Sequence, residues 1–547
     1  MSTSTVFTNG RIFCSNTPQD VFASAMVIAG QQITYVGELA DDDERVTQAK
    51  ASGSCIDLEQ KLVLPGFIDG HVHILQFGLS LQKLDLLKCR SLDEIRHEIT
   101  IYAKEFPQEP RNLCRGWIQS VTEGQARATM LDDLDPRPIY IEALDLHSTW
   151  CNFAALKELG VNSNGETPGG RIHRDALGRP SGLLEEAAQF NIVWPFLDKV
   201  ASMEKKLAAL ETAFQAHTQA GYTGLVDMAM DENNWEALNM YRKQYGEPPF
   251  HIAAYWLVPF SHNESEITRS IDRAAALHSQ FNSAHSRSIR VLGIKLILDG
   301  TVDGCTAALL QPYGGLADLV EPIWPQSFLA SAIRRATQSG LQCALHAIGD
   351  RTVQEAIDCL AEIPHARERR PRIEHLEVTT RADAKRLGDI GIIASVQPVH
   401  SDPATFEAWP QLIGDERCKR AFAYRDFVDN GAPLAFGTDA PTAKHLPLPN
   451  LYNATTRRSA LEPTMQATVN PEFALPLATS VCAATSGAAF ASFCEGWTGQ
   501  LQPGMQADMV ILDMQWNPDK LLEARVCQTW YNGTKVFDCE QMGENRA

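Results

Sequence analysis

The chain has 547 residues, of which 44% are hydrophobic and 21% charged, so it is long enough for more than one structural unit around a large core. Its net charge of −19 argues against nucleic-acid or membrane partners, and no apolar stretch approaches the roughly 20 residues of a membrane span. The 13 cysteines form no C-x-x-C pair, and the first residues show no signal-peptide pattern. These features predict a reduced, cytoplasmic protein without a disulfide framework.

Both ends of the chain show the pattern of short strands separated by turns. Val6–Thr8 is followed by Asn9-Gly10, and near the other end Thr529–Tyr531 is followed by the hairpin signal Asn532-Gly533. Chain termini often lie close together in a folded protein. We therefore predict one small β-sandwich domain formed by residues 1–60 and 490–547.

The middle of the chain alternates apolar strands with amphipathic helices, which is typical of a parallel α/β fold. The candidate strands are Val63–Ile68, Thr223–Asp227, His251–Leu257, Val291–Ile297, Gln342–His346, Arg372–His375, Ile392–Gln397 and Pro433–Phe436. They match the eight strands of a (β/α)8 TIM barrel, which we assign to residues 61–79 and 201–489. Two further strand-like runs, Asn112–Trp117 and Pro138–Leu144, predict an inserted α+β subdomain at residues 80–200 that covers the active site.

Two histidines follow the first predicted barrel strand in the motif L-P-G-F-I-D-G-H-V-H. Alternation along an extended backbone places His71 and His73 on the same side, at the barrel face where active sites lie. This predicts a pair of metal ligands. The structural alternative is a hydrogen-bonded histidine pair in a turn.

A lysine interrupts the apolar strand V-L-G-I-K-L-I-L. Burial lowers the pKa of an amine such as Lys295, and the neutral amine can react with CO2 to give a carbamate that bridges two metal ions. The alternative is an ion pair with Asp299 or Asp303.

Three further candidate ligands lie at the ends of later strands. His346 and His375 carry the imidazole that zinc prefers, and Asp439 in G-T-D-A-P can bind metal and accept a proton from water. The alternatives are core histidines bonded to backbone and a helix N-cap at Asp439.

The distribution of these residues over strands one, four, five, six and eight resembles the binuclear members of the amidohydrolase superfamily. The similarity is greatest to amidohydrolase family 3, which includes N-substituted formamide deformylase. It extends to five further segments, which are G-W at Gly116-Trp117, H-S-T-W-C-N-F-A-A-L at His147–Leu156, P-G-G-R-I-H-R-D-A-L-G-R-P-S-G-L-L-E-E-A at Pro168–Ala187, K-L-I-L-D-G-T-V-D-G at Lys295–Gly304 and L-Q-P-G-M-Q-A-D-M-V-I-L-D at Leu501–Asp513. Thr301 and Val302 depart from the Ser and Leu of many relatives, which weakens the transfer of substrate more than of chemistry.

The resemblance implies a metal-dependent hydrolase that cleaves an amide-type C–N bond of a small molecule, with an N-formyl or N-acyl amine as the leading substrate. It implies two divalent ions, zinc first, although manganese, iron or cobalt also fit these donors. Asp439 would be the catalytic base, and Trp117 and His147 would contact substrate. The structural alternatives are an ordinary core aromatic at Trp117 and a histidine hydrogen-bonded within the insertion at His147. A homodimer is expected because dimers are the commonest oligomers of soluble proteins. The alternatives are a cyclic amide hydrolase or deaminase, and a non-catalytic scaffold derived from an amidohydrolase.

Overall fold

The computed structural model describes residues 4–38, 43–51, 54–122, 125–144, 146, 148–161, 170–186 and 188–544. Its centre is an eight-stranded, all-parallel sheet in the order β8-β15-β16-β17-β18-β19-β20-β21. The strands are β8 (Phe67–Val72), β15 (Tyr222–Met230), β16 (His251–Leu257), β17 (Ile289–Ile297), β18 (Gln342–Ala347), β19 (Arg372–His375), β20 (Ile393–Val396) and β21 (Leu434–Phe436). The predicted α/β barrel is confirmed.

Backbone hydrogen bonds bring the first and last strands of this sheet together. The carbonyl of His71 accepts the N–H of Thr438 at 3.2 Å and that of Asp439 at 2.7 Å. The sheet therefore curls round on itself at the end where β8 and β21 finish.

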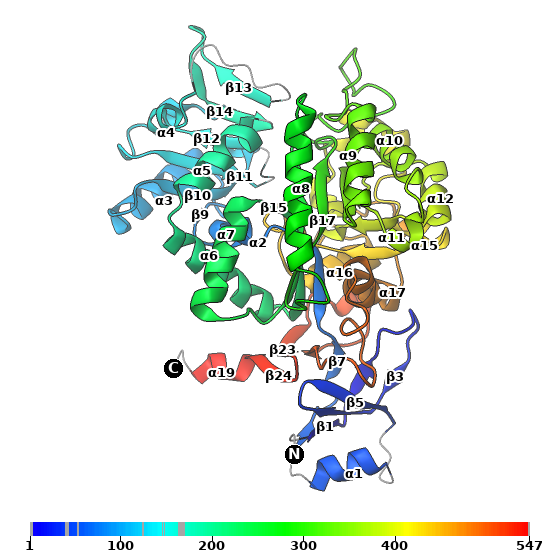
Figure 1. Cartoon of the computed structure of the whole chain (residues 1–547). Helices are drawn as coiled ribbons and strands as arrows, with labels where there is room; N and C mark the ends of the chain where they lie inside the picture. Colours follow the sequence, from blue (N-terminus) through cyan, green and yellow to red (C-terminus); the bar gives the residue numbers. More distant parts are fainter. Residues whose placement is uncertain are drawn as a thin grey trace.

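Amphipathic helices cover the outside of the barrel (Figure 1). They include α6 (Met203–Gln219), α7 (Glu232–Tyr245), α8 (Glu264–Gln280), α9 (Gln326–Gln338), α10 (Asp350–Ala361) and α12 (Arg381–Ile390). Helix α10 buries Val353, Ala356, Ile357 and Leu360, whose spacing forms one apolar stripe. Because such apolar stripes pack against the barrel, its polar residues are left to the ends of the strands.

The first barrel strand differs from its prediction. The apolar run Leu62–Val72 forms two strands, β7 (Leu62–Pro65) and β8, and only β8 belongs to the barrel. β7 pairs instead with β22 (Met509–Asp513) near the end of the chain. The chain passes from one sheet to the other at Pro65-Gly66, a turn signal inside the predicted strand. His71 consequently lies inside β8 and not beyond it.

Strands from both ends of the chain form two sheets beneath the barrel in Figure 1. One has the order β5-β4-β1-β6, and the other has the order β24-β23-β22-β7-β2-β3. Their bounds are β1 (Ser4–Thr8), β2 (Arg11–Phe13), β3 (Phe22–Ala23), β4 (Ala25–Ala29), β5 (Gln32–Gly37), β6 (Cys55–Asp57), β23 (Arg525–Tyr531) and β24 (Thr534–Asp538). Phe7, Val63, Ile511 and Trp530 share one core between the two ends. The domain boundaries themselves stay a prediction.

The insertion forms a mixed sheet beside the barrel (Figure 1). Its order is β13-β14-β12-β11-β10-β9, with α3 (Leu92–Glu105) and α4 (Phe153–Glu158) packed on it. The strands are β9 (Leu84–Asp85), β10 (Asn112–Trp117), β11 (Ile139–Ala143), β12 (Ser148–Cys151), β13 (Gly170–Arg174) and β14 (Pro180–Glu186). Among the described residues, no helix combines the length and apolar character needed to cross a membrane.

Candidate metal centre

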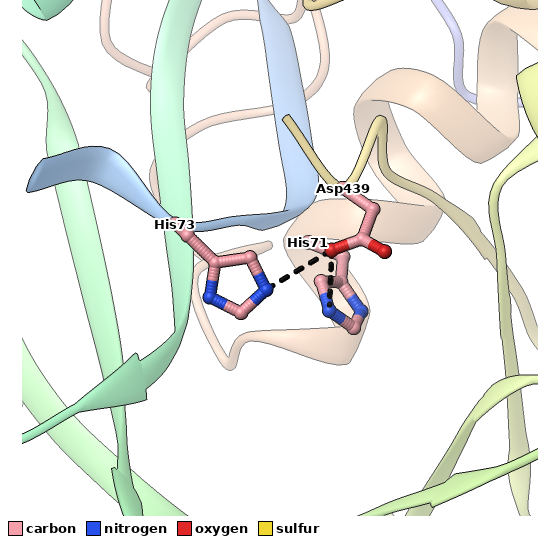
Figure 2. Close-up of side chains that lie close together, drawn as sticks. All are labelled: His71, His73 and Asp439. Atoms are coloured by element: carbon pink, nitrogen blue, oxygen red, sulfur yellow. Dashed lines mark ion pairs between the residues drawn. The ribbon is translucent and has the colours of Figure 1, made fainter. Parts of the chain in front are cut away.

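Three predicted ligands converge at the C-terminal end of the barrel strands. His71 is the penultimate residue of β8, His73 directly follows that strand, and Asp439 follows β21. Nε2 of His73 lies 3.0 Å from Oδ1 of Asp439, and Nε2 of His71 lies 3.4 Å from the same oxygen. Figure 2 shows both imidazoles directed at this carboxylate. One ligand atom from each residue lies within 4.8 Å of the others.

The spacing of these atoms suits a metal ion. Bonds of about 2.0–2.2 Å in a tetrahedral zinc site place neighbouring ligand atoms roughly 3.3 Å apart. Asp439 also adopts φ +58°, a left-handed conformation uncommon outside glycine and often found at functional sites. Its carbonyl accepts the N–H of Thr442 at 2.9 Å, and α16 (Pro447–Thr456) begins further on with Leu446 as its N-cap. Asp439 is therefore not the cap of that helix.

The charges favour the metal-binding protonation states. Burial alone would raise the pKa of Asp439, but His71 and His73 lower it well below the usual value, which keeps the carboxylate ionised. Burial lowers the pKa of His71 to about 4, with a further contribution from the charge of Lys295. A neutral imidazole and an ionised carboxylate are the forms that bind metal.

Lys295 lies within β17 with only 2% of its surface exposed. Its Nζ has no hydrogen-bond partner among the described residues, so the alternative ion pair with Asp299 or Asp303 does not form. Asp299 instead accepts the backbone N–H groups of Ile348 and Gly349. Burial lowers the pKa of Lys295 from 10.5 to about 8, which increases the neutral fraction that can react with CO2.

His346 and His375 extend this group of side chains. Their ring centroids are 4.4 Å apart, and that of His375 lies 5.0 Å from that of His71. The charge of Lys295 contributes to lowering the pKa of all three histidines, and Lys295 lies two residues before Ile297, which pairs with His346 in the sheet. His375 has φ +77° and Leu376 has φ +54°, an unusual backbone for side chains of this size. The barrel thus brings the six predicted ligands to one end.

Sequence reasoning missed Glu377 and His400. His400 lies in the short helix η4 (Pro398–Ser401) after β20, and its Nδ1 is 3.2 Å from Oε1 of Glu377. Its Nε2 lies 3.8 Å from Oδ2 of Asp439. With His375, these residues form a second group whose ligand atoms lie within 4.8 Å of one another. The sequence signal that could have revealed His400 is a histidine just beyond a predicted strand, the same signal that revealed His73.

The two predicted substrate contacts lie in the insertion. Trp117 is 1% exposed, and its ring centroid is 5.4 Å from that of Trp150 in the core of the inserted sheet. This placement favours the structural interpretation of Trp117, and its contact with substrate stays a prediction. His147 lies outside the described residues.

Comparison with known proteins agrees with the family that the barrel and its predicted ligands indicate. The sequence model of an amidohydrolase family matches residues 54–537. The chain belongs to this family. Amidohydrolase family 3, to which the motifs pointed, is thereby confirmed. The protein is therefore a metal-dependent hydrolase.

Individual known proteins resemble the chain over most of its length. Protein LONG AFTER FAR-RED 3 of Arabidopsis thaliana is 29% identical, covering 97% of this chain and 91% of its own. N-substituted formamide deformylase of Arthrobacter pascens is 23% identical, covering 94% and 95%. An uncharacterized metal-dependent hydrolase from Pyrococcus horikoshii shares the fold with a TM-score of 0.75 and 22% identity, covering 94% of this chain and 98% of that one.

Proposed function

We propose that this amidohydrolase cleaves an amide-type C–N bond of a small molecule, and that its substrate is an N-formyl or N-acyl amine. The observation that carries the proposal is the convergence of His71, His73 and Asp439 at the end of the barrel, together with the buried amine of Lys295 in β17, which has no hydrogen-bond partner among the described residues. The name of the Arthrobacter relative supports the substrate class.

We infer that two divalent ions, zinc by the nitrogen and oxygen donors, complete the site. These ions would be held between them by His71, His73, His346, His375, Asp439 and the carbamate of Lys295. When bound, such ions lower the pKa of a water molecule toward about 7 and polarise a carbonyl oxygen.

Asp439 handles the proton in the proposed reaction. Its ionised carboxylate accepts a proton from the attacking water as the new C–O bond forms. It then returns that proton to the nitrogen as the C–N bond breaks, leaving a carboxylic acid and an amine. The carboxylate would be held in place for both transfers as a ligand of the metal site that Asp439 shares with His71 and His73.

Elemental analysis of protein purified without chelators, followed by a substrate panel, tests the proposal. About two ions per chain, with turnover of N-formyl or N-acyl amines, is the expected result. Turnover restricted to cyclic amides or amino-heterocycles would assign the site to ring opening or deamination. If the protein binds no ion after addition of zinc and bicarbonate and turns over no substrate, the non-catalytic scaffold is the function that remains. We also expect a homodimer, which light scattering would detect.

A further inference from the structure

A buried carboxylate meets the far side of the His71 ring. Oε2 of Glu374 lies 2.7 Å from Nδ1 of His71, and the two side chains are 0% and 1% exposed. The other ring nitrogen, Nε2, is the one that faces Asp439. Since an ionised carboxylate only accepts hydrogen bonds, this contact requires the proton on Nδ1 and leaves the lone pair of Nε2 free.

Arg372 holds that carboxylate in place. Its Nε donates to Oε1 of Glu374 at 2.5 Å, and its Nη2 donates to Ser395 Oγ at 2.6 Å and to the carbonyl of Gly70 at 2.7 Å. The guanidinium also lies over the ring of Tyr255, 5.3 Å from its centroid. Because Gly70 directly precedes His71, Arg372 fixes both the carboxylate and the backbone that carries the ligand.

We propose that Glu374 and Arg372 are positioning residues that keep His71 in the Nδ1–H tautomer, with Nε2 directed at the metal site it shares with His73 and Asp439. A carboxylate bonded to the second nitrogen of a ligating imidazole fixes its orientation and raises its basicity as a ligand. The inference rests on the proposed function only in treating His71 as a metal ligand.

Two observations distinguish this role from that of a buried ion pair that only stabilises the core. The pair touches a predicted ligand directly, and Glu374 immediately precedes a second one, His375. A buried pair is itself weak evidence of stabilisation, because desolvation of both charges opposes their attraction. Nε2 of Gln397 lies 3.3 Å from the same Nδ1, but an amide nitrogen only donates hydrogen bonds, so it cannot take the place of the accepting carboxylate.

The test measures metal affinity in two variants. Glu374→Gln keeps the shape but removes the charge, and Glu374→Leu with Arg372→Met removes both charges at similar volume, which is often tolerated. Zinc dissociation constants come from competition with a chelator on metal-free protein. We expect the tightest constant to weaken about 10- to 100-fold in both variants. Histidine 15N spectra of the metal-free paired variant should show His71 losing its Nδ1–H tautomer, because leucine cannot accept a hydrogen bond.

Asp402→Asn provides the matched control. Asp402 is fully buried near β20 and accepts the N–H of Ala460 at 2.7 Å and of Leu461 at 3.1 Å. This variant should melt earlier but keep the wild-type zinc constant. A folded Glu374 variant, single or paired, with the wild-type constant and tautomer would overturn the positioning role alone. A wild-type chain that binds no ion would overturn both this inference and the proposed function.

Discussion

Replacing Lys295 by methionine should stabilise the metal-free protein and impair the metal-loaded one. Burial lowers the pKa of the amine from 10.5 to about 8, so the folded protein disfavours the charged form. The resulting loss of folding stability is fully present below pH 8 and disappears only above pH 10.5. The difference corresponds to about 3 kcal/mol. Methionine is of similar length and uncharged, so the free energy of unfolding at pH 7 should rise by up to that amount.

The metal-loaded variant should behave in the opposite way. Without Lys295 no carbamate can form, so we expect one ion per chain in place of two and a loss of turnover of at least about 100-fold. Thermal unfolding of chelated and zinc-loaded protein, with elemental analysis of the same samples, measures both effects.

Lys206→Met is the control for the substitution itself. Lys206 is also buried, with 5% exposed, but its amine contacts Asn233, so its loss should not stabilise the protein or change the metal content. The reasoning about Lys295 would be refuted by a variant with two ions and wild-type turnover. A metal-free Lys295→Met protein less stable than wild type would refute it as well.

Three other outcomes are expected. Asp439→Asn should lower kcat by about 100- to 10,000-fold, with the protein folded and at least one ion still bound, because it removes the proton acceptor; near-normal turnover would contradict that role. Chelation should lower the melting temperature, by the equivalent of about 3 kcal/mol where zinc had been present at 100 times its dissociation constant, and added zinc should restore it. Glu377→Gln and His400→Asn should each retain two ions if Lys295 helps to hold the second; loss of one ion in both would assign that ion to the group around His375.

The barrel could be predicted closely because its strands are short apolar runs with clear ends. The predicted run His251–Leu257 coincides with β16, and Gln342–His346 ends one residue before β18 does. The prediction was wrong at Val63–Ile68, which was taken as one strand although Pro65-Gly66 divides it between two sheets. Only the partners of each half decide its sheet, and one of them, β22, lies at the other end of the chain.

The side chains that support the ligands were harder to find than the ligands. A histidine at a strand end stands out in the sequence, whereas R-I-E-H reads as an ordinary polar and apolar alternation. Nothing in it indicates that Arg372 and Glu374 are both fully buried, since that depends on Ser395 and Gly70 from neighbouring strands of the closed sheet. Trp117 shows the converse: an aromatic residue in a family motif lies in the core of the insertion.

Closure of the barrel and assembly of the metal centre are the same structural event. The carbonyl that accepts the N–H of Asp439 belongs to His71, so the hydrogen bond that joins the last strand to the first also joins two ligands. The approach is close enough to require glycine: a Cβ at Gly437 would lie 2.4 Å from the backbone nitrogen of His71 and 2.5 Å from its Cβ. The ligands on the first and last barrel strands meet only in the closed sheet. Metal binding at this site must therefore favour the closed barrel over any open form.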